Sequence, residues 1–166
     1  MQKNHMGKEY ARELEEEVAA TQKCLSRMRS DLYDWKPHER SMTMGQLAVL
    51  VADMVRWIAL AIRDGMVDFQ TYDRFDTKDT EELLRHFDKN KDAALTALLS
   101  VSDEALEGKF KLKNGDMILM DTSLKFIIRS TINHLVHHRG QLTVYMRLQN
   151  IPVPSIYGPS ADDKNF

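Results

Sequence analysis

Two histidines four residues apart are the strongest candidates for chemistry in this sequence. His134 and His138 lie in a long segment with a helical pattern. Residues four apart on a helix share one face, with Cβ atoms about 5–6 Å apart. Two imidazoles placed in this way can converge on one cation, as in metal sites that use this spacing. The alternative is that both side chains hydrogen-bond to core partners or face solvent.

The neighbours of this pair could support it. Gln141 and Tyr145 continue the same face of the helix, and Gln141 could orient His138 or a substrate. His137 points about 100° away from His138 and is interpreted as a packing or hydrogen-bonding residue. Gly140 costs a helix interior about 1 kcal/mol relative to alanine. Close approach of another helix would explain a glycine there.

The remaining histidines and the single cysteine show no partner in the sequence. His5 lies in the N-terminal segment, His38 in a loop and His86 in a helical segment, so we interpret all three as ordinary polar residues. Cys24 excludes a disulfide within the chain and excludes a multi-cysteine metal cluster. Its helical context favours a half-buried structural thiol over a nucleophile.

Four amphipathic segments must position the histidine pair. Apolar residues recur every three or four positions in residues 8–28, 44–64, 80–101 and 122–149, which predicts four helices. Ser41 or Thr43 could begin the second helix and Gly65 could end it, whereas Asp121 or Thr122 could begin the fourth. The pattern predicts an all-α fold, a single four-helix domain over residues 1–166.

Residues 103–121 carry the strand-like signal in this sequence. Residues 110–113 alternate between apolar and basic side chains, and Asn114-Gly115 is a typical tight-turn dipeptide. We therefore expect a short hairpin or an extended loop between the third and fourth helices. The aromatic segment between the second and third helices, residues 65–78, is interpreted as a loop that packs over an edge of the core.

The overall charge gives no attraction to polyanions. Formal net charge is −2 and the isoelectric point is near 6.3, so neither nucleic acid nor a membrane is an expected partner. The first ten residues are polar and do not resemble a signal peptide. A cytoplasmic location is the resulting expectation.

Several stretches together resemble the DinB-like (DinB/YfiT) family of damage-inducible bacterial proteins. These are Trp-Lys-Pro at residues 35–37, Ser-Met-Thr-Met-Gly-Gln-Leu-Ala at 41–48, Asn-His at 133–134, His-His-Arg-Gly-Gln-Leu at 137–142, Tyr-Met-Arg at 145–147 and Pro-Val-Pro-Ser-Ile-Tyr-Gly-Pro-Ser at 152–160. The resemblance implies a four-helix bundle, often dimeric, with a divalent metal held by three histidines. Two of those positions correspond to His134 and His138, and the third corresponds to Leu50.

Leu50 cannot ligate a metal, so the resemblance implies a site with two of three ligands. Asp53, one turn further along the same face, could supply an oxygen, although a surface or helix-pairing carboxylate is the simpler role. A metal such as Ni, Zn or Fe on this pair would activate a thiol or a water. The implied function is a metal-dependent enzyme of the thiol transferase or hydrolase type, with its catalytic residues unassigned.

The alternative is a metal-free protein of the same fold. Leu50 gives this position a core-like lining, which would suit a small ligand bound between helices. Such a chain would act as a small-ligand-binding or stress-response protein. In both cases we expect a homodimer, because the second helix is apolar on most sides and because the resemblance implies one.

Overall fold

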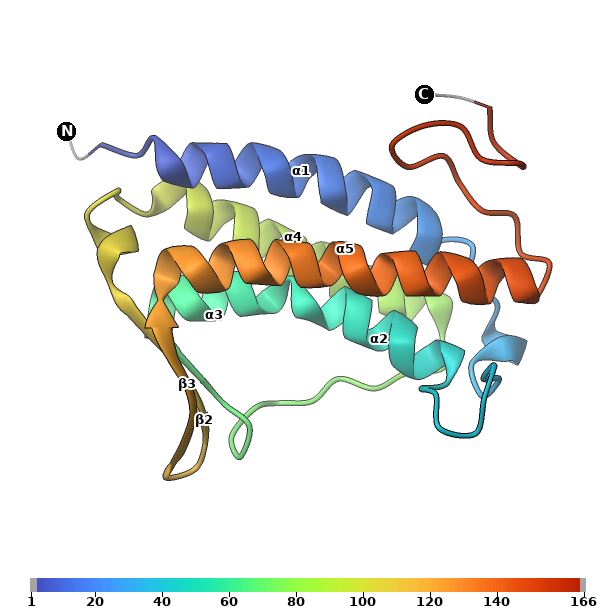
Figure 1. Cartoon of the computed structure of the whole chain (residues 1–166), viewed down its shortest axis with the longest axis horizontal. Coiled ribbons are helices and arrows are strands. Elements are labelled where there is room, and N and C mark those ends of the chain that lie inside the picture. The colour runs from blue at the N-terminus through green and yellow to red at the C-terminus, as the bar shows by residue number, and fades with distance from the viewer. Residues whose placement is uncertain (1–2, 165–166) are drawn as a thin grey trace.

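The computed structural model describes residues 3–164 as a bundle of long helices from which a hairpin projects (Figure 1). Every segment predicted to be helical is helical, with ends that differ by a few residues. Short 3₁₀ turns at Ser30–Leu32 and Ala105–Glu107 lie in the connections. The α-helices are α1 Met6–Leu25, α2 Met44–Met54, α3 Arg56–Asp64, α4 Thr80–Ser100 and α5 Leu124–Leu148.

The predicted second helix is broken at Val55 into α2 and α3. Its first turn is fixed by a reciprocal cap, in which Thr43 Oγ1 accepts from the Gln46 amide and Gln46 Oε1 accepts from the Thr43 amide. Its end is Gly65, which adopts φ +64°. Both ends therefore follow the sequence signals. No glycine or proline marks Val55, so the pattern held no sign of the break.

The main core lies between the long helices. Helix α1 packs against α4, α3 packs against α4, and α2 packs against α5. The residues that fill this core are aliphatic or aromatic, and many are fully excluded from solvent: Leu14, Leu25, Leu47, Val51, Phe87, Leu98 and Ile128. A second cluster, which includes Phe110 and Ala61, joins α3 and α5 to the strands. The apolar stripes seen in the sequence are thus the packing faces.

The prediction of an all-α fold is wrong, because a three-stranded mixed sheet accompanies the helices. Strands β1 Met66–Asp68, β2 Lys109–Asn114 and β3 Met117–Ser123 lie in the order β1-β2-β3. The expected hairpin is β2 and β3, which pair antiparallel. The unexpected strand is β1, which follows the turn at Gly65 and pairs parallel to β2. Its three residues are too few for alternation to show in the sequence.

Strand β3 also moves the start of α5. Ser123 ends the strand, and its side chain accepts a hydrogen bond from the Phe126 amide at 3.2 Å. The predicted caps Asp121 and Thr122 instead belong to β3, because the strand continues up to the first turn of the helix. Strand and helix therefore meet without a loop.

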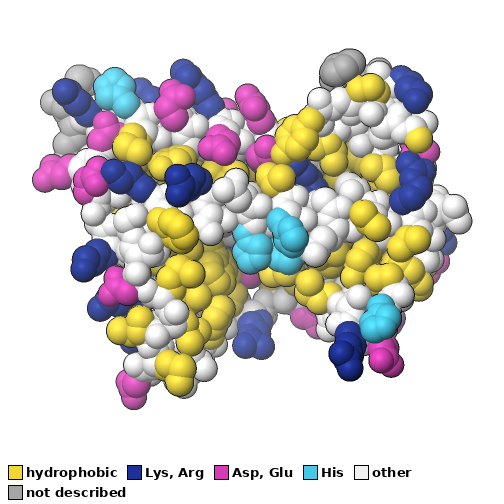
Figure 2. Space-filling view, viewed as in Figure 1, with side chains coloured by type: hydrophobic (Ala, Val, Ile, Leu, Met, Phe, Trp, Pro, Cys, Tyr) yellow, Lys and Arg dark blue, Asp and Glu magenta, His cyan; other side chains and the backbone are white. Residues whose placement is uncertain are grey.

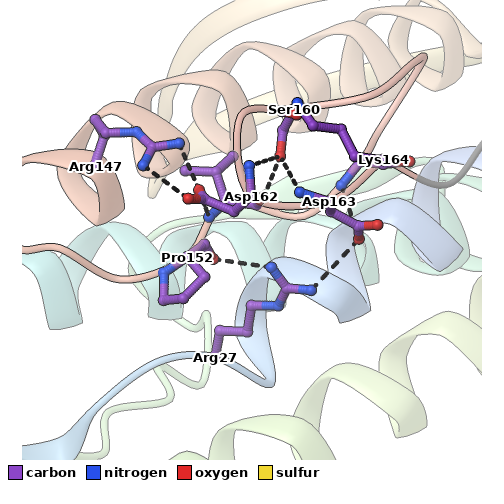
Figure 3. A network of polar contacts seen from close by, with 9 residues as sticks. Arg27, Arg147, Pro152, Ser160, Asp162, Asp163 and Lys164 are labelled. Carbon is purple, nitrogen blue, oxygen red and sulfur yellow. Dashed lines mark hydrogen bonds and ion pairs between the residues drawn. The ribbon is translucent and has the colours of Figure 1, made fainter.

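The C-terminal segment folds back on the bundle through a polar network (Figure 3). Arg147 pairs with Asp162 at 2.5 Å, and Arg27 donates to the Pro152 carbonyl at 3.0 Å and lies 3.6 Å from Asp163. Ser160 Oγ accepts from the amides of Asp162 and Asp163. These contacts hold the segment against the ends of α1 and α5.

Residues Met44–Asp64, which comprise α2 and α3, are long and apolar enough to cross a membrane by length and composition. Half of the most apolar window is buried inside the chain, where it packs against other helices. The core helices of globular proteins meet the same criterion. The segment is a core element of this fold.

Candidate functional site

His134 and His138 meet on α5. Their Nε2 atoms lie 2.9 Å apart, within hydrogen-bond distance, and their ring centroids are separated by 4.6 Å. His138 is buried, with 9% of its surface exposed, whereas His134 is exposed. The ring of His137 lies edge-on to His138 at 5.0 Å, and His137 is exposed. Helical spacing therefore brings the predicted pair into direct contact.

Gln141 fixes the protonation pattern of this pair. Its side-chain oxygen lies 2.7 Å from His138 Nδ1. An amide oxygen can only accept a hydrogen bond, so His138 Nδ1 carries the proton and its Nε2 presents a lone pair. His134 Nε2–H then donates to that lone pair, which leaves His134 Nδ1 as an acceptor. The expected orienting role of Gln141 thus has a geometric basis.

Although the residue is exposed overall, the pKa of His134 is lowered, first by partial desolvation of its ring and then by the positive charge that His138 and His137 would carry. Both effects disfavour the imidazolium form. The neutral form of His134 is therefore favoured near neutral pH.

A cavity of about 500 Å³ lies beside His134. It is bounded by α2, α3, α5 and the hairpin, together with the loop after β1. Most of its wall is apolar, with Asp53, Ser130, Thr131 and His134 as the polar members. The apolar lining residues are Leu50, Met54, Trp57, Phe69, Leu112, Met120 and Ile127.

Leu50, the position that the resemblance assigns to a third ligand, lines the same cavity as His134. Its side chain is half-buried and also borders a second cavity of about 510 Å³, which shares Leu50 and Asp53 with the first. The leucine contributes an apolar wall where a ligand atom would be needed.

Asp53 is engaged elsewhere. Its carboxylate accepts a hydrogen bond from the Tyr72 hydroxyl, and its Oδ1 lies 2.8 Å from His86 Nε2 and 3.9 Å from Arg56. The side chain is 15% exposed. Burial and the adjacent carboxylate raise the pKa of Tyr72, which keeps its hydroxyl protonated as a donor. Asp53 is therefore a helix-pairing carboxylate between α2 and α4.

His86 has a structural role that the sequence did not indicate. It pairs with Asp53 and stacks face to face on Phe75, with ring centroids 3.7 Å apart. Its partners come from a different helix and from the loop at residues 69–79, so no spacing rule could have joined them. The one available signal was the three aromatic residues in that loop, which do pack over the core edge as expected.

The residues present do not fit a three-ligand metal centre. Among residues 3–164, no group of three His, Cys, Asp or Glu side chains is placed to hold a metal ion. Two imidazoles contact each other, the third position is Leu50, and both oxygens of Asp53 have partners. Catalytic zinc usually takes three protein ligands and one open position. The site is instead an imidazole pair beside an apolar cavity.

Cys24 lies outside this site. It is fully buried in α1, and burial raises the pKa of its thiol to about 11. A thiol with that pKa stays protonated and is a poor nucleophile at neutral pH. A structural role remains our interpretation, and the thiol is fully buried where half-burial was expected.

Known proteins resemble the chain at the level of family and fold. A model of the DinB family matches residues 1–165. The solved structure of a DinB-like protein from Bacillus cereus has a TM-score of 0.69 and 22% identity, and covers 89% of this chain and 95% of that one. The corresponding values for the DinB-like protein YjoA from Bacillus subtilis are 0.66, 19%, 86% and 92%.

A shorter sequence match is to the uncharacterized protein YrdA from Bacillus subtilis, which is 53% identical over 32 residues. That match spans 19% of this chain and 19% of the relative. The solved structures establish a shared fold at these identities.

Proposed function

This chain belongs to the DinB family, and we propose that it binds a small apolar molecule in the cavity beside His134. The observation that carries the proposal is the cavity itself, about 500 Å³ with a mostly apolar wall and a few polar groups. Small-molecule sites in proteins have this size and composition. The apolar side chain of Leu50 in the cavity wall favours an apolar ligand over a cation.

The polar end of the ligand would meet His134. Because the hydrogen bonds from His138 and Gln141 leave His134 Nδ1 as an acceptor, the matching group is a donor. A hydroxyl or a thiol on an otherwise apolar molecule satisfies both parts of the site. The proposed ligand class is therefore a small apolar alcohol, phenol or thiol.

Two probes that differ by one hydroxyl test this assignment. We expect 4-ethylphenol to bind more tightly than ethylbenzene by roughly 2- to 10-fold, the worth of one neutral hydrogen bond. Isothermal titration calorimetry of the purified chain measures both affinities. In the variant His134→Leu the preference for the phenol should disappear while binding of ethylbenzene persists. Equal affinities in the unaltered chain would rule out the proposed donor.

A cavity-filling variant tests the location. Ser130 lines the cavity from α5 and is half-buried, so Ser130→Phe would place a ring in the space with little disturbance of the core. Asn133→Phe adds the same ring on an exposed position of the same helix, outside the cavity. We expect the first variant to lose binding of 4-ethylphenol and the second to keep it. Loss in both, or in neither, would place the ligand elsewhere.

Metal-dependent chemistry of the thiol transferase or hydrolase type remains the second candidate. It is favoured by His138, whose Nε2 lone pair is oriented by Gln141 in the manner of metal-binding histidines. Equilibrium dialysis against Zn²⁺ and Ni²⁺ separates the two candidates. Our proposal predicts that Leu50→His binds either ion more tightly than the unaltered chain. Equal stoichiometric binding by both proteins would establish the metal site instead.

A further inference from the structure

A second cavity adjoins the one beside His134. It has a volume of about 510 Å³ and is lined by the first turns of α2 and by the loop at residues 72–78, and Leu50 and Asp53 border both spaces. Figure 2 shows a hollow below the histidine side chains of α5, between the hydrophobic surface of the hairpin and that of α2. The two cavities therefore meet along α2, at the side chains of Leu50 and Asp53.

The second cavity differs from the first in the chemistry of its wall. Asp53 is the one Asp, Glu, Lys or Arg side chain among the described residues that line the cavity beside His134. The second cavity has this carboxylate and four further charged side chains, which are Asp34, Arg74, Asp76 and Lys78. A molecule that occupied both spaces would therefore be apolar at one end and charged or strongly polar at the other.

Arg74 is the cation of the second cavity that is available to a ligand. Lys78 already pairs with Asp34 at 2.6 Å, whereas the Arg74 guanidinium makes no hydrogen bond or ion pair within residues 3–164. The side-chain nitrogen of Gln46, in the same wall, also has no acceptor in that range, because the helix cap uses only the amide oxygen. The groups left for a ligand are thus mainly N–H donors.

Asp76 is the carboxylate of this cavity that has no partner within residues 3–164, and its charge opposes an anion. A guanidinium nevertheless offers five N–H donors and a side-chain amide two more, which exceeds what the two oxygens of one carboxylate can accept in a direct contact. Arginine also binds carboxylates through two parallel hydrogen bonds. The excess of donors favours a carboxylate over an ammonium group as the ligand's polar end.

We propose that the ligand of this protein carries a carboxylate, which binds Arg74 in the second cavity while its apolar body lies beside His134. This inference rests on the proposed function, because it keeps the apolar body and the hydroxyl or thiol assigned to the first cavity. The hydrocarbon part passes Leu50, the apolar side chain that borders both cavities. The ligand class is thereby narrowed to elongated apolar hydroxy acids and mercapto acids.

Two probes of one length test the carboxylate. 6-(4-Hydroxyphenyl)hexanoate and 6-(4-hydroxyphenyl)hexanamide differ in charge and in little else. We expect the hexanoate to bind roughly 3- to 10-fold more tightly in isothermal titration calorimetry, between the worth of an exposed ion pair and that of a hydrogen bond to a charged group. Raising the ionic strength should reduce this preference, since exposed charges are screened by salt. Equal affinities for the two probes would overturn the inference.

Two variants with opposite expected effects locate the carboxylate. Arg74→Gln should abolish the preference for the hexanoate, and Asp76→Asn should increase it because the opposing charge is removed. Arg85→Gln is the matched control, since this exposed arginine on α4 lines neither cavity, and it should keep the preference. A preference that Arg74→Gln leaves intact, or one that Asp76→Asn lowers, would contradict binding at Arg74.

4-Ethylphenol separates this inference from the proposed function, because it carries the hydroxyl without the carboxylate. Val49 lines the second cavity and not the first, so Val49→Phe should weaken binding of the hexanoate by more than binding of 4-ethylphenol. Binding of 4-ethylphenol together with equal affinities for the hexanoate and the hexanamide would overturn the inference alone. Absence of 4-ethylphenol binding to the unaltered chain would overturn both proposals.

Discussion

Asp53 shows how a single carboxylate can be committed to structure beside a candidate site. It receives the Tyr72 hydroxyl from the loop after β1 and contacts His86 from α4, so three segments meet at one side chain. A hydrogen bond to a charged group typically contributes about 1.5–3 kcal/mol. Its engagement by these partners explains why Asp53 does not complete a metal site with the imidazole pair.

Replacing Tyr72 by phenylalanine should therefore lower the free energy of unfolding by about 1.5–3 kcal/mol, since the carboxylate loses a donor in a half-buried place. Tyr10→Phe is the matched control, because the described residues offer its hydroxyl no hydrogen-bond partner. Its expected change is within about 0.5 kcal/mol. Urea denaturation measures both. Equal effects of the two variants would show that the Tyr72 hydroxyl contributes little.

His134 makes stability depend on pH. Its pKa is lower in the folded chain than its ordinary value of 6.5, so the unfolded chain takes up the proton more readily. The contribution is complete above that ordinary value and is lost as the pH falls below it. We expect the unfolding free energy to decrease on acidification from about pH 7.5 to about pH 5.5, and to decrease less in His134→Gln. A control variant, His5→Gln, should behave like the unaltered chain.

At the scale of elements, helix α5 carries the histidine pair. The packing around this helix does not explain why Gly140 is a glycine. The close helix approach expected at Gly140 is absent, because a Cβ built there would meet nothing within 4 Å. Gly140→Ala should accordingly raise the unfolding free energy by about 1 kcal/mol through helix propensity alone. Gly45→Ala gives the opposite expectation, since the added Cβ would lie 2.6 Å from the ring of Tyr33. Thermal unfolding of both variants tests the contrast.

The elements differ in how far the sequence could predict them. Helix ends with chemical markers were found, as Thr43 and Gly65 show, because caps act over three or four residues. The break at Val55 and the strand β1 were missed. Strand β1 depends on pairing with a segment distant in the chain, as Met66 pairs with Lys111, and no glycine or proline marks the break at Val55. The periodicity of residues within one segment does not reveal its pairing with a distant segment.

The same division holds for the site. The contact between His134 and His138, with Gln141 beside it, was predictable because all three lie within two turns of one helix. The cavity and the partners of Asp53 were not, since they join α2, α4, α5, the hairpin and the aromatic loop.

In the molecule as a whole, the bundle, the hairpin and the aromatic loop enclose a space that none of them forms alone. The cavity takes walls from α2, α3 and α5, from Leu112 and Met120 of the sheet and from Phe69 of the loop. His134 lines that wall, and its Nε2 contacts His138. The proposed ligand site is therefore formed jointly by several elements, and the imidazole pair provides its polar end.

The most direct test is ¹⁵N NMR of the histidine side chains during titration with 4-ethylphenol. We predict that the Nδ1 signal of His134 shifts on binding because it accepts the phenol hydroxyl, while the signals of His5 and His38 stay unchanged. Ethylbenzene should leave the His134 signal nearly unmoved. A titration in which 4-ethylphenol binds without moving the His134 signals, or does not bind at all, would show that His134 does not hold the ligand.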